Sequence, residues 1–125
     1  MKRKEKKNPI KGLKRRAWEA FSRFIRLRDP LCVTCGAPTA HAGHYQNNSE
    51  RKQDLGGNSL WYDERNVHGQ CVGCNLFKSG NLAAYAIFLE KTYGVGILQE
   101  LNVLYRTAKK WTREEIEGII ERYEI

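Results

Sequence analysis

The stretch NVHGQCVGCN, residues 66–75, combines a Cys-x-x-Cys pair with polar side chains on both sides of it. His68 stands three residues before Cys71, and Asn75 follows Cys74 directly. A metal ion bound by the two thiolates would fix this turn, and it would therefore also fix where the Asn75 side chain points. The stretch predicts half of a zinc site and leaves open whether the same turn carries chemistry.

A second pair, in CVTCG at residues 32–36, completes the ligand set of one tetrahedral zinc ion. In a reducing compartment, paired Cys-x-x-Cys turns favour metal thiolates over disulfides; redox-active or merely buried thiols are the alternative, but neither requires a matched second pair. The 35 residues between the two pairs exceed the spacing of a simple zinc ribbon, so a substantial element is expected between them. The predicted zinc ligands are Cys32, Cys35, Cys71 and Cys74.

The charge of the chain is concentrated at its N-terminal end. Its 125 residues, 41% of them apolar, suit one domain with a small core, and the net charge is +8. Residues 1–28 contribute +10 and the remaining residues −2. Counterion release favours the binding of such a segment to a polyanion, so DNA is the expected partner, and a tail that only aids solubility is the alternative.

Membrane association and export are not expected. The sequence has no apolar run long enough to cross a bilayer, and its basic N-terminus lacks the apolar centre of a secretion signal. We therefore expect a cytoplasmic protein with no membrane partner.

The pattern along the chain predicts an α+β fold. Residues 1–12 are expected to be a disordered basic arm, and the apolar spacing over 13–28 predicts a helix that Asp29-Pro30 ends. Residues 39–46 are compatible with a strand and residues 60–70 contain the expected return strand, which together predict a hairpin around a polar loop.

Three helices are expected after the second cysteine pair. Thr112 and Glu115 stand at capping-box spacing at the start of the last one, and Gly94 is the expected stop of the first. The predicted helices cover 75–94, 95–108 and 111–125. Residues 13–125 would form one domain, with a zinc-stapled core at about 30–94 and C-terminal helices at about 95–125.

Five segments, in order, are similar to the phage recombination nucleases of the lambda NinG type: CVTCG, AGHY, YDERNVHGQCVGCN, SGNLAAY and KTYG. The order of knuckle, strand, strand and second knuckle also resembles the HNH, or His-Me finger, nucleases and, more distantly, recombination endonuclease VII, whose second knuckle is likewise followed by an asparagine. The match covers roughly residues 30–105. It implies a small ββα-metal core with the zinc site between the knuckles, flanked by the basic N-terminal helix and the C-terminal helices, and a location in the host cytoplasm.

The resemblance implies roles for three polar residues. His44 would be the general base, Asn66 the asparagine that fixes the hairpin, and Asn75 a ligand of the catalytic divalent metal. Many members of the wider class have an aspartate or histidine ligand directly before the base, where this chain has Gly43. The second metal ligand is therefore open.

Four residues are candidates for that second ligand. His68 and Asp63 are favoured, because His68 is next to the knuckle and both lie in the predicted second strand, whereas Glu64 is a further candidate. His41 is the fourth, although an isolated histidine is more often a surface or a hydrogen-bonded core residue.

These residues predict a metal-dependent endonuclease that hydrolyses the phosphodiester bonds of DNA. A neutral histidine takes a proton from water near pH 7, while Mg²⁺ or Mn²⁺ held by few protein groups neutralises the phosphate; the zinc ion would be structural. Because little suggests readout of bases, we expect DNA shape to select branched recombination intermediates such as a Holliday junction or a D-loop. The residues expected to contact DNA are Lys11, Lys14, Arg15, Arg16, Arg51, Lys52, Arg65 and Lys78.

Two other functions fit the same sequence. A non-catalytic zinc-ribbon protein would bind DNA through the basic arm without cleaving it, and a less structure-selective HNH nuclease would nick DNA of many shapes. The apolar faces of the last two helices would either complete one core or pair with a second subunit, so a homodimer is a further expectation.

Overall fold

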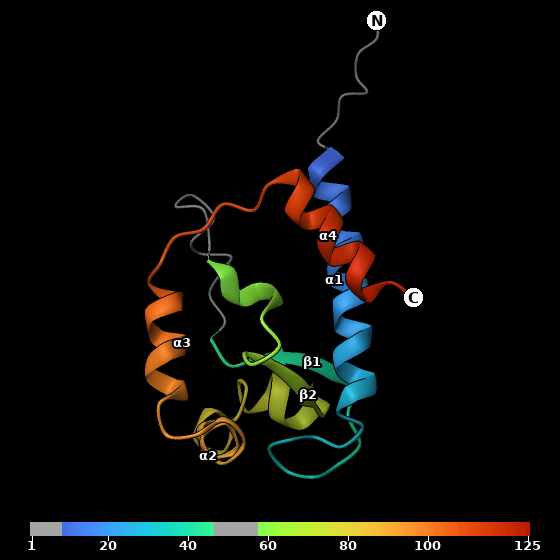
Figure 1. Cartoon of the computed structure of the whole chain (residues 1–125). Helices are drawn as coiled ribbons and strands as arrows, with labels where there is room; N and C mark the ends of the chain where they lie inside the picture. Colours follow the sequence, from blue (N-terminus) through green and yellow to red (C-terminus); the bar gives the residue numbers. More distant parts are fainter. Residues whose placement is uncertain (1–8, 47–57) are drawn as a thin grey trace, which may run out of the picture.

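Helices from both ends of the chain surround a two-stranded hairpin in this computed structural model (Figure 1). The structure describes residues 9–46 and 58–125. The fold is mixed α+β. The elements, in order, are α1 Pro9–Arg28, β1 His41–His44, the 3₁₀ helix η3 Ser59–Tyr62, β2 Val67–Gln70, the π-helix η4 Gly73–Phe77, α2 Leu82–Tyr93, α3 Ile97–Tyr105 and α4 Arg113–Tyr123.

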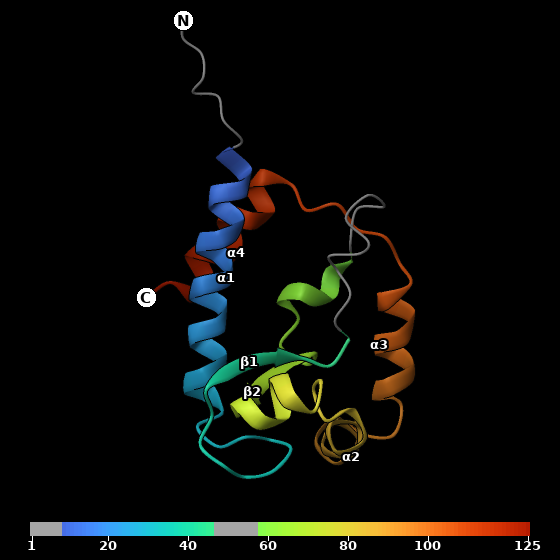
Figure 2. The same cartoon turned by 180° about the vertical axis from the view of Figure 1, so that it is seen from behind.

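One core lies between α1, α4 and the hairpin. The helical spacing of Ala17, Phe21 and Ile25 gives α1 a stripe of side chains with no exposed area, and Ile116 of α4 packs against it. The two helices lie side by side in both views (Figures 1 and 2). The chain end is thus folded back onto the basic N-terminal helix.

A second core joins η3, α2 and α3. Tyr85 and Leu89 of α2 are fully buried against Leu60 of η3 and Leu101 of α3. Asn58 links these elements to the segment that follows α3, because its side-chain nitrogen donates to the Tyr105 carbonyl at 3.3 Å. The hairpin therefore has one core on each side.

The register of the hairpin decides which side chains share a face. The strands are antiparallel, with His41 opposite Gln70, Gly43 opposite His68 and His44 opposite Val67. Directly opposite residues point to the same face of a sheet, and successive residues alternate between faces. Consequently one face, toward α1, carries Ala42, His44, Val67 and Gly69, and the other carries His41, Gly43, His68 and Gln70.

The N-terminal helix is longer than predicted. It begins at Pro9, so the expectation that the disordered arm extends to residue 12 was wrong for residues 9–12. Proline suits the first turn of a helix, because its φ angle is already helical and its missing amide proton has no partner there in any case. Residues 1–8 of the predicted arm lie outside the described part of the chain.

The return strand expected within residues 60–70 is confirmed over Val67–Gln70, and the residues before it are not extended. Two side chains turn the preceding backbone away from an extended path: Asn58 Oδ1 accepts from the Leu60 amide at 3.0 Å, and Asp63 Oδ1 accepts from the Arg65 amide at 2.9 Å. The predicted loop between the strands lies almost wholly outside the described residues.

The helix predicted over 75–94 is interrupted. η4 ends at Phe77, and Ser79, Gly80 and Asn81 all have φ angles between 49° and 95°, which breaks the helical path before α2 begins. The predicted stop at Gly94 is confirmed as the C-cap of α2. So is the capping box of Thr112 and Glu115 at the start of α4.

In the described ranges, 9–46 and 58–125, every helix is too short or too polar to span a membrane.

Candidate functional site

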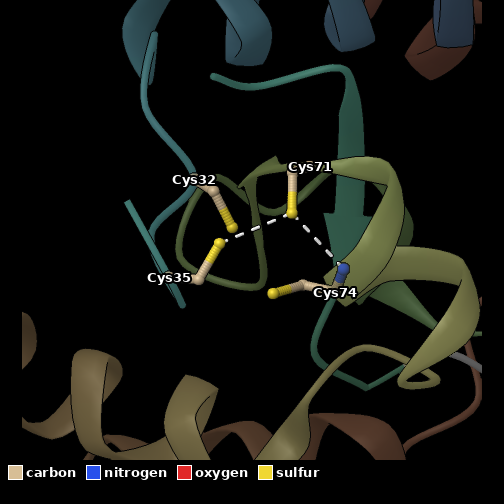
Figure 3. A group of neighbouring side chains, drawn as sticks. All are labelled: Cys32, Cys35, Cys71 and Cys74. Atoms are coloured by element: carbon tan, nitrogen blue, oxygen red, sulfur yellow. Dashed lines mark hydrogen bonds between the residues drawn. The ribbon is translucent and has the colours of Figure 1, made fainter. Parts of the chain in front are cut away.

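The four cysteines of the two Cys-x-x-Cys turns come together at the end of the hairpin. Their sulfur atoms all lie within 4.8 Å of one another, and Figure 3 shows the four side chains pointing toward one another. Thiolates bound to one zinc ion at about 2.3 Å are separated by about 3.8 Å, so the cluster needs little movement to hold zinc. The donor set fits a structural zinc ion.

The backbone brings the first turn against the hairpin. Gly36 has a φ angle of 88°, and its amide donates to the Cys32 carbonyl at 2.8 Å, which closes the turn. The Val33 amide donates to the Gly69 carbonyl of β2 at 3.0 Å. Burial raises the pKa of the Cys32 thiol, but hydrogen bonds from Thr34 and from backbone amides outweigh it and lower the pKa to about 6. A low pKa favours the thiolate that a metal requires.

The second turn continues directly into η4 and thereby positions Asn75. The Asn75 amide donates to the Cys71 carbonyl at 3.0 Å, and the buried side chain of Cys74 anchors the start of η4. The Asn75 side chain reaches β1, where its nitrogen lies 3.1 Å from His41 Nδ1. An amide nitrogen only donates, so His41 Nδ1 accepts this hydrogen bond and carries a lone pair.

Gln70 brings a third polar group to the same face. Its side-chain nitrogen donates to the Gly80 carbonyl at 2.8 Å and to Thr34 Oγ1 at 3.1 Å. Since the Gly80 carbonyl accepts only from the nitrogen, the Gln70 amide cannot be reversed, and its oxygen points toward Gly43. That oxygen is buried and has no hydrogen-bond partner among the described residues. A buried acceptor of this kind is usually satisfied by a water molecule or a bound ion.

Glycine at position 43 is explained by this arrangement. A Cβ atom there would lie 2.1 Å from Gln70 Oε1 and 2.9 Å from Asn75 Oδ1. Any side chain would displace both amide groups. The space beside Gly43 is thus filled by two amide oxygens from other parts of the chain.

His44 lies on the opposite face of the hairpin from Asn75 and packs against two indole rings that also contact each other. The ring centroids of Trp18 and Trp61 are 5.0 Å and 4.0 Å from that of His44, and both pairs are stacked. His44 Nε2 is 3.2 Å from the Trp61 carbonyl oxygen, which only accepts, so Nε2 carries the proton and Nδ1 has a lone pair. Burial lowers the pKa of His44 to about 4, so the ring is neutral at pH 7.

Asn66 has the contacts of a residue that fixes the hairpin. It has no exposed area, and its side-chain oxygen accepts from the Gln46 amide at 2.9 Å. Its nitrogen donates to the carbonyls of Gln46 and Leu60, at 3.1 and 3.2 Å. One side chain thus joins the end of β1 to η3.

His68, a favoured second ligand, is fully engaged elsewhere. The Tyr85 hydroxyl donates to the Gly43 carbonyl at 2.7 Å, so it accepts from His68 Nδ1, 3.2 Å away. His68 Nε2 then accepts from the Tyr93 hydroxyl at 2.9 Å. Burial, followed by the positive charge of Arg28, lowers the pKa of His68 to about 3. The buried imidazole therefore holds Gly43 in place and has no free nitrogen for a metal.

The two acidic candidates are also paired with other groups. Asp63 accepts from Arg65 in an ion pair with a 3.1 Å separation. Glu64 accepts from the Tyr123 hydroxyl of α4 at 2.6 Å. Of the four candidates for the second ligand, His41 is the one that the structure brings to Asn75.

The two buried histidines predict how folding stability depends on pH. Their folded-state pKa values, about 4 for His44 and about 3 for His68, lie below the ordinary value of 6.5. The unfolded chain binds protons as the pH falls through 6.5 and the folded chain does not, so this stability is complete above pH 6.5 and is lost progressively toward pH 4. We expect the free energy of unfolding in urea to fall by roughly 2 kcal/mol between pH 7 and pH 5.5.

Zinc content must be equal at both pH values, since protonation of thiols also weakens metal binding. Imidazole signals followed by NMR over the same range provide the site-specific readout. Titration of His44 and His68 with midpoints near 6.5 would contradict their burial as neutral rings.

The residues predicted to contact DNA differ in their exposure and in whether acidic side chains already pair with them. Lys11, Lys14 and Arg15 lie on the exposed side of α1, and Lys78 is exposed after η4. Arg16 is also exposed on α1, but it forms an ion pair with Glu124. Arg65 pairs with both Asp63 and Glu100, at 3.1 and 2.6 Å, so it is held by acidic groups. Arg51 and Lys52 lie outside the described residues.

Gln70, Trp18 and Trp61 were not identified from the sequence as parts of the site. The alternation in HAGH and VHGQ was a usable signal, because it separates His41 from His44 and places Gln70 with His41 once the register is known. The two indoles had no such signal, since their contact with His44 depends on the packing of α1 and η3.

Together, the fold and the cysteine cluster define a small α+β protein with a candidate zinc centre formed by two Cys-x-x-Cys turns. The model of the family described as Bacteriophage Lambda NinG protein matches residues 1–125, and the chain belongs to that family. Over 115 residues, it is 36% identical to Protein ninG of Salmonella phage P22 and to Protein ninG of Escherichia phage lambda.

These alignments cover 88% of this chain but 53% of each relative. Protein ninG of Escherichia phage 933W gives the same identity, with 54% of its length covered. The chain thus spans about half the length of the curated relatives it matches. No solved structure matches the chain significantly.

Proposed function

We propose that this chain is a metal-dependent DNA endonuclease of the HNH type that acts on branched recombination intermediates. The observation that carries the proposal is the convergence of His41, Gln70 and Asn75 on one face of the hairpin, beside the candidate zinc centre. The Gln70 oxygen is buried without a partner among the described residues, and the Asn75 oxygen lies beside it at Gly43. His41 Nδ1 now accepts from the Asn75 nitrogen and would bind a metal only by releasing that hydrogen bond.

The chemistry of these donors suits a divalent cation. Amide oxygens are ligands for Mg²⁺ and Mn²⁺, and an imidazole nitrogen suits Mn²⁺ better than Mg²⁺. When bound, such an ion would neutralise charge on a phosphate oxygen. Among the described residues, the only cluster of three or more His, Cys, Asp or Glu side chains is that of the cysteines, so the donor set at Asn75 is neutral. We therefore expect metal and DNA phosphate to bind together, because the phosphate supplies the missing negative charge.

His44 is the proposed general base. Its Nδ1 has the required lone pair, and Trp61 fixes the ring by stacking and through its carbonyl. Hydrolysis in line requires the attacking water and the leaving oxygen to lie on opposite sides of phosphorus. A phosphate seated across the unpaired edge of β1 would meet Asn75 on one side of the hairpin and His44 on the other. His44 is only 8% exposed, which limits the access of water to its ring. We therefore compare the effect of substituting His44 with that of substituting His41.

The DNA backbone would be held by the exposed basic side of α1. Lys11, Lys14 and Arg15 stand within two turns of this helix, and Trp18 of the same helix stacks on His44. Contacts to phosphate place a protein on DNA without reading bases. The same helix would then connect DNA binding to the position of the base.

The test is cleavage of matched linear duplex, single-strand, flap, D-loop and four-way-junction DNA, with and without Mg²⁺ or Mn²⁺. We expect metal-dependent cleavage, fastest on the branched substrates. In His44→Ala it should be absent at every metal concentration, whereas in His41→Ala it should recover in part as Mn²⁺ is raised, because a lost ligand is compensated by mass action. Wild-type rates in a folded His44→Ala protein would overturn the assignment of the base.

The rival is a zinc protein that binds DNA without cleaving it. The burial of His44 and the neutral donor set at Asn75 are the observations that favour it. Tight binding of wild type to the branched substrates, with intact DNA in both metals, would decide for the rival.

A further inference from the structure

The turn that carries Asn75 also presents an exposed apolar surface. Phe77 is 82% exposed and Leu76 is 59% exposed, both in η4, and the exposed Lys78 follows directly. In the described part of the chain, Phe77 is the phenylalanine with the most exposed side chain; Phe21 and Phe24 pack in the first core and Phe88 against the second. An aromatic ring that is this exposed buries little apolar area and therefore contributes little to folding stability.

The ring is held outward by a rigid turn. The Lys78 amide donates to the Gly73 carbonyl at 2.9 Å, and the Gly80 amide donates to the Cys74 carbonyl at 2.8 Å. Cys74 itself belongs to the cysteine cluster. The backbone on both sides of Phe77 is therefore fixed to the turn that carries the cysteine cluster.

We infer that Phe77 stacks on a nucleobase that is unpaired or unstacked at a DNA branch, with Lys78 beside it on the phosphate. The inference rests on the proposed function and names the feature of DNA that the site would recognise. Aromatic rings bind bases of any sequence through their faces, and apolar side chains insert where stacking is already weak. Asn75 and Phe77 belong to the same helix two residues apart and point to different sides of it, so such a base would lie across η4 from the proposed site of hydrolysis.

We assign DNA as the ligand of this apolar surface from the charge and position of its neighbours. Lys78 gives this apolar surface a positive neighbour, and the exposed side of α1 is basic, so a polyanion with exposed ring faces suits both features. A protein partner would bury Phe77 and Leu76 equally and would show no preference for branched DNA. That alternative is therefore an outcome of the test.

The experiment measures DNA binding in Ca²⁺, which supports binding without requiring hydrolysis. A four-way junction and a linear duplex of the same sequence carry 2-aminopurine at the branch position, and affinity and fluorescence are followed for each variant. Phe77→Ala is compared with Phe77→Trp, which keeps a stacking ring, and with Val103→Ala, which removes another exposed apolar side chain, from α3.

We expect Phe77→Ala to bind the junction about 10-fold more weakly or worse, while its affinity for linear duplex changes little. The fluorescence change at the branch should disappear in Phe77→Ala and return in Phe77→Trp. Val103→Ala should behave as wild type. An unchanged ratio of junction to duplex affinity in folded, zinc-loaded Phe77→Ala would overturn the inference. Absence of cleavage by the wild type in Mg²⁺ would instead count against the proposed function, since this assay does not depend on cleavage.

Discussion

Replacing Cys74 by serine, or removing zinc with a chelator, is expected to unfold the hairpin and the start of α2. Cys74 joins the metal cluster to η4, and the first turn is attached to β2 through Val33 and Gly69. Structural zinc contributes on the order of 10 kcal/mol to small domains, which is comparable with the whole stability of a domain of this size. Loss of the ion should therefore remove most of the folding free energy.

The measurement is a thermal melt followed by circular dichroism, together with the zinc content of the purified chain. We expect one zinc per chain and a cooperative transition that disappears in Cys74→Ser and in excess chelator. Val72→Ala is the matched control, because Val72 lies inside the same turn but is 39% exposed and offers no ligand. Identical melts for wild type, Cys74→Ser and chelated protein would exclude a structural metal here.

Asn66→Ala is expected to cost about 3–5 kcal/mol of folding stability. The substitution removes the partner of the Gln46 amide and of the Gln46 carbonyl, whereas the Leu60 carbonyl keeps its bond from the Asp63 amide. Each buried group left without a hydrogen bond costs about 1–3 kcal/mol, and a small cavity adds to the sum. The effect is large because one buried side chain bonds both backbone groups of Gln46.

Urea unfolding at constant zinc content measures this change. Asn102→Ala is the control, because Asn102 is exposed in α3 and its substitution should change stability by less than about 0.5 kcal/mol. If Asn66→Ala were as mild as its control, the hydrogen bonds of Asn66 would not be what joins β1 to η3.

Features set by local chemistry were predictable from the sequence. Paired cysteines require one common centre, and the structure brings all four together. The capping box at Thr112 and the stop at Gly94 depend on a few neighbouring residues, and both are as predicted. The same local logic missed the start of α1, because residues 9–12 were assigned to the disordered arm although proline suits the first turn of a helix.

Features set by packing were not predictable in the same way. The favoured ligand His68 looked available because it is next to the second knuckle, but Tyr85 and Tyr93 occupy both of its nitrogens from α2. His41 looked isolated until η4 brought Asn75 to it. Gly43 looked like a missing ligand, and its contacts with Gln70 and Asn75 became visible only in three dimensions.

We propose that the turn after Cys74 places Asn75 to hold a divalent cation for DNA cleavage. Single-turnover cleavage of a four-way junction by wild type and by Asn75→Ala, over a range of Mg²⁺ and Mn²⁺ concentrations, tests this role. We expect the rate at low Mg²⁺ to be about 100-fold lower for Asn75→Ala, with partial recovery at high Mn²⁺. Equal rates for the two proteins at low Mg²⁺, with zinc content and folding unchanged, would rule out Asn75 as a ligand of that cation.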